Sequence, residues 1–317
     1  MRVVQFMIPG QGRRVGVIDE ESVVDLTTGD CRLTSVYAAF QAAFAKQISF
    51  TQFLKEAASA SGNTRYSYSD LLEGSPGEDC AYILPPVDHP DPHSLLVTGT
   101  GLTHTGSMQS RDQMHANADD ASQTDSAKMF AMGLKGGKPS PGTRGVSPEW
   151  FYKGNGSILR GQRDQLDIPG FALDGGEEPE IVGCYVIAPD GTPRRLGFVL
   201  GNEWSDHETE TINYLYLAPS KLRTCAIGPE LNTDFDFVDL TIRCTVRREG
   251  KIIYESGDLK TGAEFMCHSL ENCEDHHFKY PQHRQPGDVH LHFLGTSKLS
   301  HSTRDWKYET GDEIRIE

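Results

Sequence analysis

The sequence Gly-Gly-Glu-Glu-Pro-Glu-Ile-Val-Gly spans residues 175–183 and contains three glutamates. Residues two apart in an extended strand point to the same face, so Glu178 and Glu180 project together. Neighbouring carboxylates repel each other, and a bound cation removes that repulsion. Ligation by oxygen alone favours Mg²⁺, Mn²⁺ or Ca²⁺ over zinc. The pattern indicates a metal-binding strand or, alternatively, an acidic surface turn.

Pro179 lies between the two glutamates and has no backbone N–H to donate to a neighbouring strand. The segment is therefore expected at a sheet edge or at the start of a strand. A second acidic segment, Leu-Gly-Asn-Glu-Trp-Ser-Asp-His-Glu at residues 200–208, follows an apolar run where a strand would end. It offers either Glu203 or Asp206 as a third carboxylate.

Lys221 follows shortly afterwards and precedes the Ile-Gly-Pro sequence of residues 227–229. A lysine beside an acidic metal site orients a substrate carboxylate or stabilises an enolate. The alternative interpretation is an ordinary surface lysine.

The first 84 residues are predicted to form a small α+β domain. Short β-rich runs occur at residues 3–6, 15–18 and 22–26, and residues 34–60 have apolar side chains close to helical spacing. Gly- and Pro-containing segments precede a boundary near residues 83–89. The predicted domains are therefore residues 1–84 and residues 85–317.

The larger domain is predicted to be β-rich with few helices. Four predicted strands, one helix and two flexible closing loops follow from its patterning. The strands are residues 181–188, 195–201, 235–247 and 251–256, with a hairpin at Gly250; the helix is residues 261–277; the loops are residues 105–120 and 133–144.

Composition narrows the class of partner. Thirty Lys and Arg residues against 45 Asp and Glu residues give a formal net charge of −15. This charge opposes non-specific binding to nucleic acid or to an anionic membrane, and it argues against a nuclease or phosphatase. Seven cysteines without a Cys-x-x-Cys pair indicate reduced thiols, and the sequence begins without a secretory segment. We expect a soluble cytoplasmic protein with neither nucleic-acid nor membrane partners.

Taken in order, these segments resemble the fumarylacetoacetate hydrolase family. The family's D-x-E-x-E strand matches residues 176–180, its N-D-x-S segment matches residues 202–205, and its lysine before Ile-Gly-Pro matches Lys221. Residues 151–153 resemble its F-x-K segment, and residues 311–314 resemble its closing G-D-x-I strand. The resemblance covers residues 80–317 and is nearest to the sugar-acid branch, which includes the 2-keto-3-deoxy-pentonate dehydratases.

The resemblance implies a mixed α/β, β-rich fold, with a β-roll or barrel catalytic domain behind the small N-terminal domain, and a homodimer. It also implies Mg²⁺, or Mn²⁺ with Ca²⁺ as a further possibility, bound by Glu178, Glu180 and Glu203. Family members act on 2-oxo acids, whose carboxylate and C2 oxygen bind the metal. Lys221, assisted by Lys153, would then stabilise an enolate.

Several positions depart from the family pattern. Gly176 replaces the first acidic residue, and His207 replaces an arginine. Ser107 replaces the histidine that activates water in the hydrolases, and His104 lies one helical turn earlier. The Thr-Gly-Thr-Gly turn is altered around Thr296. Ser107 and Thr296, with Lys153, are the predicted substrate-binding residues, and His104 is the predicted general acid.

The missing histidine favours dehydration over water-dependent C–C cleavage. We therefore predict a metal-dependent dehydratase of a 2-keto-3-deoxy sugar acid, with a 2,5-dioxo acid such as 2-oxoglutarate semialdehyde as product. The alternatives are a C–C bond hydrolase of a 2,4-dioxo acid and a non-catalytic ligand-binding protein. Residues 267–292 are rich in histidine and cysteine, but their spacing matches no zinc motif, and structural histidines are the preferred interpretation.

Overall fold

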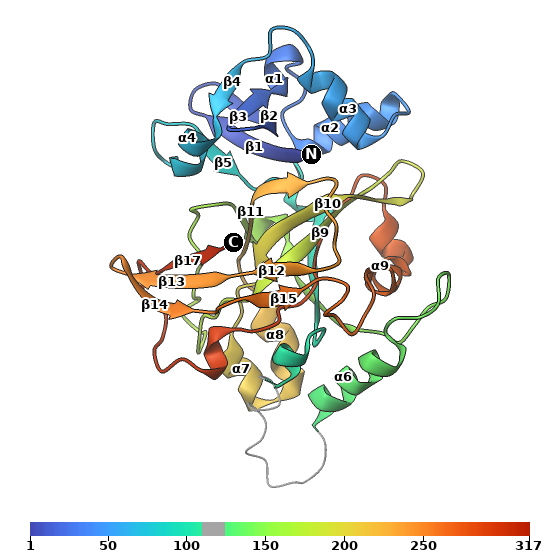
Figure 1. The fold of residues 1–317 in the computed structure, drawn as a ribbon, viewed down its shortest axis with the longest axis vertical. Helices are drawn as coiled ribbons and strands as arrows, with labels where there is room; N and C mark the ends of the chain where they lie inside the picture. Colours follow the sequence, from blue (N-terminus) through green and yellow to red (C-terminus); the bar gives the residue numbers. More distant parts are fainter. Residues whose placement is uncertain (110–123) are drawn as a thin grey trace.

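Residues 1–109 and 124–317 are described in a computed structural model of the chain, drawn in Figure 1. Residues 1–84 form a lobe at one end of the ribbon. Three helices lie toward the opposite end: α6 (Asp125–Gly136), α7 (His207–Ile212) and α8 (Leu217–Lys221). The predicted closing loop at residues 105–120 falls largely outside the described residues.

A mixed sheet of twelve strands organises the molecule, in the main order β4-β3-β2-β1-β11-β10-β9-β16-β6-β7, with β5 beside β1 and β8 beside β11. Its ends, β4 and β7, do not pair with each other in the described part of the chain, so this sheet is open rather than a closed barrel. The strands are β1 (Arg2–Ile8), β2 (Gly12–Asp19), β3 (Ser22–Asp25), β4 (Arg65–Ser67), β5 (Tyr82–Leu84), β6 (Leu95–Gly101), β7 (Glu149–Asn155), β8 (Leu159–Arg160), β9 (Pro179–Ile187), β10 (Pro193–Asn202), β11 (Cys225–Asn232) and β16 (Val289–Phe293).

Two smaller sheets cover part of the body. One pairs β12 (Leu240–Ile242) with β15 (Leu259–Thr261), and the other has the order β14 (Lys251–Glu255), β13 (Cys244–Arg248), β17 (Glu313–Ile316). The predicted hairpin at Gly250 is confirmed: Glu249 and Gly250 both have positive φ, at 50° and 77°. Such a two-residue turn matches the twist of the strands that it joins. The strand predicted over residues 235–247 is instead two short strands.

Five further helices are short, and serine side chains cap the start of four of them. They are α1 (Leu26–Gly29), α2 (Val36–Ala45), α3 (Phe50–Ala58), α4 (Tyr68–Glu73) and α9 (Leu270–Phe278). Residues 34–60, whose spacing is helical, form two helices rather than one, because Gln47 has a φ of 56° and the Ser49 side chain caps a new helix. The helix predicted over residues 261–277 begins only at Leu270, after a cap by Ser269.

The N-terminal lobe shares its sheet with the rest of the chain. Strand β1 is antiparallel to β11, with Arg2 opposite Asn232 and Val3 opposite Leu231. One buried apolar cluster includes residues from both parts, such as Phe40 and Val199. The predicted boundary after residue 84 coincides with the end of β5, and the division into two domains stays a prediction.

Strand β9 lies in the middle of the sheet, between β10 and β16. All nine of its residues are buried. Pro179 is its first residue, so the prediction of a strand start is right and the alternative of an edge strand is wrong. The acidic segment therefore lies at the start of a strand that is buried along its whole length.

All seven cysteines are unpaired in the structure. Within residues 1–109 and 124–317, no helix is both long and apolar enough to cross a bilayer.

Four histidines near the C-terminus pack against one another beside Trp150 of β7. The ring of His277 lies 5.0 Å from that of His290 and 4.8 Å from those of His283 and His292, centroid to centroid. Both ring nitrogens of His292 contact threonine hydroxyls, at 2.8 Å and 2.6 Å. Burial lowers the pKa of His290 and of His292 to about 3. The cluster therefore packs as neutral imidazoles.

Acidification from pH 7.5 to pH 5.5 should reduce the free energy of unfolding. A histidine whose folded-state pKa is depressed contributes its full stability above its ordinary pKa of 6.5, and that stability is lost as the pH falls toward the folded-state pKa. His290 and His292 should each cost about 1.4 kcal/mol over this interval. Urea unfolding at several pH values measures the slope, and His93→Gln, at an exposed position, should leave it unchanged. A free energy that is independent of pH would contradict burial of neutral histidines.

Candidate metal centre

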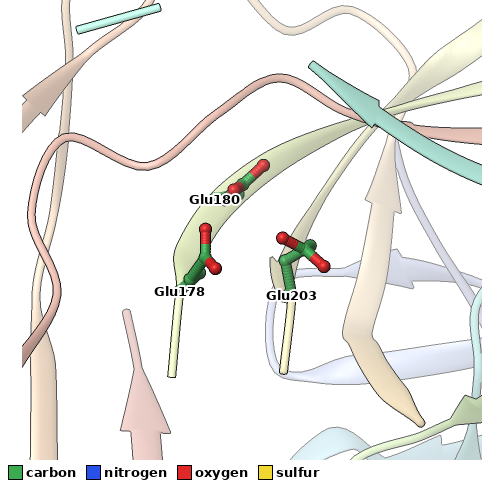
Figure 2. Close-up of side chains that lie close together, drawn as sticks. All are labelled: Glu178, Glu180 and Glu203. Atoms are coloured by element: carbon green, nitrogen blue, oxygen red, sulfur yellow. The ribbon is translucent and has the colours of Figure 1, made fainter. Parts of the chain in front are cut away.

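The pairing of β9 with β10 brings the three predicted ligands together. Asn202 lies opposite Pro179, so the next residue, Glu203, lies opposite Glu178, and its N–H donates to the Glu178 carbonyl at 3.0 Å. Glu180 shares a face with Glu178 because the two are two residues apart. Figure 2 shows Glu178 just before β9, Glu180 within it, and Glu203 just after the end of β10. One carboxylate oxygen from each lies within 4.8 Å of the others, and all three side chains are buried.

Three buried carboxylates this close repel one another. Burial raises the pKa of Glu180 well above its ordinary value, and the neighbouring charges of Glu203 and Glu178 add to this effect. Two buried lysines oppose the repulsion. The Lys221 ammonium lies 2.5 Å from Glu178 and 2.8 Å from Glu203, and the Lys153 ammonium lies 2.7 Å from the other Glu203 oxygen.

Lys153 has a different position from the one predicted for a substrate-binding residue. Its ammonium donates to the backbone carbonyls of Trp204 and Lys221, at 2.6 Å and 3.0 Å, and contacts Glu203. The side chain is fully buried and does not line the pocket described below. It therefore orients Glu203 and ties the end of β10 to α8.

Glu180 is oriented by the backbone. The N–H of Gly295 donates to its carboxylate at 2.7 Å. Gly295 has a φ of +93°, and a Cβ there would lie 2.0 Å from the Thr103 hydroxyl oxygen. Glycine is therefore required at this turn for both its backbone conformation and its small size.

Two departures from the family pattern depend on each other. The His207 Nε2 lies 2.9 Å from a Glu178 oxygen, and burial lowers the pKa of His207 well below its ordinary value. A Cβ on Gly176 would lie 2.1 Å from the His207 Nδ1. Any larger residue at position 176 would displace the imidazole. The absence of a carboxylate at Gly176 and the presence of His207 thus have one steric cause.

A small pocket leads to the carboxylates. Glu178, Glu180 and Lys221 line it together with the predicted substrate-binding residues Ser107 and Thr296. The hydroxyls of those two residues donate to backbone carbonyls at 2.9 Å, which leaves their oxygens as acceptors. The other lining residues are Gly101, Leu102, Phe151, His207, Glu210, Gly295 and Leu299.

Glu210 lines the pocket but was not predicted as a site residue from the sequence. It is buried in α7 three residues after His207, and both side chains line the pocket. Residues three apart on a helix share a face, so this spacing is the signal that could have identified it. The signal requires knowing that α7 begins at His207.

His104 is not among the residues that line the pocket, and its role as the general acid stays a prediction. Its two ring nitrogens lie 2.9 Å and 3.0 Å from the hydroxyl oxygens of Thr103 and Thr261. Burial lowers its pKa to about 4. An imidazole held between two threonines in this way stabilises the packing of two segments.

The carboxylate of Asp206, the alternative third ligand, binds groups outside the carboxylate cluster. Its carboxylate accepts from the N–H of Thr209 as the cap of α7, and from the Arg223 guanidinium at 3.0 Å. Glu203 is therefore the residue that completes the carboxylate cluster.

The cluster fits a divalent cation with a preference for oxygen ligands. In the described part of the chain, Glu178, Glu180 and Glu203 form the one group of at least three His, Cys, Asp or Glu side chains with ligand atoms this close. Three carboxylates without nitrogen or sulfur suit Mg²⁺ or Mn²⁺. A bound cation would also offset the repulsion that raises the pKa of Glu180.

Comparison with known proteins agrees with this architecture. No family model and no curated protein matches the sequence. Among solved structures, 2-keto-3-deoxy-D-arabinonate dehydratase complexed with magnesium and 2,5-dioxopentanoate has a TM-score of 0.69 at 18% identity, over 100% of this chain and 94% of that chain. Fumarylacetoacetate hydrolase from Exiguobacterium antarcticum has a TM-score of 0.60 at 15% identity, over 100% and 95%. The chain has the fumarylacetoacetate hydrolase fold.

The fumarylacetoacetate hydrolase fold also includes an isomerase. 2-Hydroxyhepta-2,4-diene-1,7-dioate isomerase from Mycobacterium marinum is similar at a TM-score of 0.53 and 15% identity, over 100% of this chain and 93% of that chain. The predicted mixed α/β, sheet-dominated class is confirmed. Proteins of this fold carry different activities, so function has to be argued from the site.

Replacing Glu180 with glutamine should weaken Mn²⁺ binding by more than about tenfold, because the site loses a charged ligand. The metal-free variant should lose no more than about 1 kcal/mol of unfolding free energy, since one of three repelling charges is gone. Titration monitored by the electron paramagnetic resonance of free Mn²⁺ gives the affinity, and urea unfolding gives the stability. Glu208→Gln, at a carboxylate that is 45% exposed, is the control. Unchanged affinity in Glu180→Gln would rule Glu180 out as a ligand.

Glu203 and Asp206 can be distinguished in the same way. Glu203→Gln should lose Mn²⁺ affinity, whereas Asp206→Asn should keep it within about twofold but lose about 1–3 kcal/mol of stability with its cap and ion pair. The reverse result, with metal affinity following Asp206, would mean that the wrong carboxylate has been assigned.

Proposed function

We propose that this protein is a divalent-metal-dependent dehydratase of a 2-keto-3-deoxy sugar acid. The observation that carries the proposal is the buried cluster of Glu178, Glu180 and Glu203 around the Lys221 ammonium, beside the pocket that Glu178, Glu180 and Lys221 line. Similarity of fold to 2-keto-3-deoxy-D-arabinonate dehydratase supports it, as does the 2,5-dioxopentanoate bound in that protein. Removal of one water from a 2-keto-3-deoxypentonate gives the same dioxo acid, with the C5 alcohol becoming the aldehyde.

A divalent cation held by the three glutamates would supply Lewis acidity to a bound 2-oxo acid, which makes the C3 protons easier to remove. The protein's own residues then have separate tasks. Lys221 is held by Glu178 and Glu203, so its ammonium is in position to donate hydrogen bonds to substrate oxygens as they gain negative charge. Its ammonium lies 5.1 Å from the centre of the Phe151 ring, which lines the same pocket.

Ser107 and Thr296 offer hydroxyl oxygens at the pocket wall, and Leu102 and Leu299 contribute apolar surface. Apolar walls limit the access of water to a charged intermediate, which suits elimination. His207 is the one histidine lining the pocket in the described part of the chain, and its Nε2 is next to Glu178. Ser107 stands where the hydrolases have their water-activating histidine, and elimination does not require that histidine, which supports dehydration over hydrolysis.

A C–C bond hydrolase of a 2,4-dioxo acid is the second candidate. One observation favours it: the buried Nδ1 of His207 has no hydrogen-bond partner among the described residues. A nitrogen of this kind accepts a proton from water if a water molecule reaches it. A non-catalytic ligand-binding protein is the third candidate, and turnover of either class of substrate excludes it.

The central experiment uses protein stripped of metal and resupplied with Mg²⁺. It is incubated with the 2-keto-3-deoxypentonate isomers and, separately, with 2,4-dioxo acids, and the products are identified by mass. We expect Mg²⁺-dependent loss of one water from a 2-keto-3-deoxypentonate. Release of pyruvate from the dioxo acids would establish the hydrolase instead, and metal binding without turnover of either class would favour the binding protein.

Lys221→Met should reduce kcat on the dehydration substrate by about 100-fold or more, with a smaller change in KM, because the ammonium acts on charge that develops during the reaction. Lys260→Met is the control, since that ammonium lies at the surface beside Asp239. Steady-state kinetics at saturating Mg²⁺ measure both constants. An unchanged kcat in Lys221→Met would remove Lys221 from the mechanism.

Four statements stay predictions: that the protein is a homodimer, that it binds a 2-oxo acid, that it is cytoplasmic, and that it has no nucleic-acid or membrane partner. Of these predictions, the carboxylate pocket supports only the one that the protein binds a small molecule.

A further inference from the structure

Residues 294–300, called the strap below, connect the end of β16 to the short helix η5 (Ser300–Ser302). Between these two elements the backbone is neither helix nor strand. Thr296 and Leu299 line the pocket from the strap. Irregular backbone cannot satisfy its polar groups by regular pairing, so the position of this pocket wall depends on contacts with neighbouring elements.

Both ends of the strap bind to the acidic segment that begins β9. At the first end, the Gly295 N–H donates to Glu180 at 2.7 Å. At the other end, Ser300 donates twice to Glu177: its backbone N–H to one carboxylate oxygen at 2.6 Å, and its hydroxyl to the other at 2.7 Å. Glu180 is a predicted metal ligand, whereas Glu177 has no part in the metal cluster or in the mechanism proposed above.

The Glu177 carboxylate is fully buried, at 0% exposure. It accepts a third hydrogen bond from the Tyr308 hydroxyl at 2.7 Å, and the Tyr308 ring packs edge-on against Trp204, with ring centroids 4.9 Å apart. Burying a carboxylate is costly unless hydrogen bonds compensate for the lost water, and bonds to a charged acceptor are the strong ones. All three donors belong to the strap or to the chain just after it, so Glu177 anchors this part of the molecule.

Glu177 directly precedes Glu178, whose carboxylate lines the pocket. Consecutive residues of an extended segment point in opposite directions. Glu178 therefore reaches the pocket while Glu177 reaches the end of the strap, and the two positions are coupled through one peptide unit. A displacement of the strap relative to Glu177 would move Thr296 and Leu299 relative to the predicted metal ligands.

We propose that Glu177 is a positioning residue: by anchoring the strap, it fixes the pocket wall of Thr296 and Leu299 relative to the metal-site carboxylates and so determines how tightly the pocket binds its ligand. The anchoring is independent of the proposed function. The effect on a 2-oxo acid rests on that function, because it assumes that the pocket takes such a ligand.

Hydrogen exchange tests the anchoring without metal or ligand. Glu177→Gln keeps the size of the side chain but replaces one acceptor oxygen with an NH₂ group, which cannot accept a hydrogen bond. Backbone amides in peptides that cover residues 294–300 should exchange at least about tenfold faster than in the wild-type protein, because the strap opens locally. Peptides from β1 should exchange at the wild-type rate.

Two milder variants keep this test decisive should Glu177→Gln not fold. Ser300→Ala and Tyr308→Phe each remove one donor and leave the carboxylate in place, and each should accelerate exchange in the strap by about threefold or more. Tyr68→Phe is the matched control, because that hydroxyl also donates to a carboxylate, Glu230, at 2.9 Å and does not line the pocket. It should leave exchange in the strap unchanged.

Ligand affinity tests the positioning. Glu177→Gln should weaken binding of 2-oxopentanoate to the Mg²⁺-loaded protein by about tenfold in isothermal titration calorimetry, while Mn²⁺ affinity stays within about threefold of wild type. With the dehydration substrate, KM should rise by about tenfold and kcat should change by less than about threefold. A loss of folded protein alone would lower the apparent kcat and leave KM unchanged.

The outcomes that overturn the inference are distinct from failure of the proposed function. Wild-type exchange in the strap of all three variants would mean that Glu177 is no anchor. Faster exchange with unchanged affinity for 2-oxopentanoate would refute the positioning role, and a loss of Mn²⁺ affinity equal to that of Glu180→Gln would make Glu177 part of the metal site instead. If 2-oxopentanoate does not bind to the wild-type protein, the proposed function and the effect on the ligand fail together, while faster exchange in Glu177→Gln would still establish the anchor.

Discussion

Mutual repulsion among Glu178, Glu180 and Glu203 is the constraint on which the surrounding structure depends. The register of β9 with β10 places three buried carboxylates within 4.8 Å of one another. Like charges opposite each other on paired strands destabilise a sheet, and burial increases the cost. Lys153 and Lys221 offset part of it. An arrangement that opposes folding in this way is expected where function requires it.

The contacts made by this cluster restrict which residues can occupy the neighbouring positions. Gly295 places a backbone donor on Glu180 in a conformation that favours glycine, and Gly176 leaves room for the His207 ring that contacts Glu178. Each acidic ligand is thus oriented by a separate partner before any ligand arrives. Such preorganisation reduces the reorganisation required when charge develops on a substrate.

Local spacing predicted part of this site, and pairing between strands decided the rest. The shared face of Glu178 and Glu180 follows from their separation by two residues. The choice between Glu203 and Asp206 depends on register, which no local pattern gives, and the structure assigns Asp206 to a helix cap. His104 was predicted from its place near Ser107, but burial between two threonines removes it from the pocket. The mixed, sheet-dominated fold was predictable because several motifs occur in order, whereas the open sheet and its continuation into the N-terminal lobe depend on long-range pairing.

Anomalous diffraction from a crystal soaked with Mn²⁺ is the most direct test of the central claim that the three glutamates form a metal site. The account predicts one strong anomalous peak bounded by the carboxylates of Glu178, Glu180 and Glu203. The absence of a peak there at saturating Mn²⁺, or a peak at the histidine cluster around His277 instead, would contradict it.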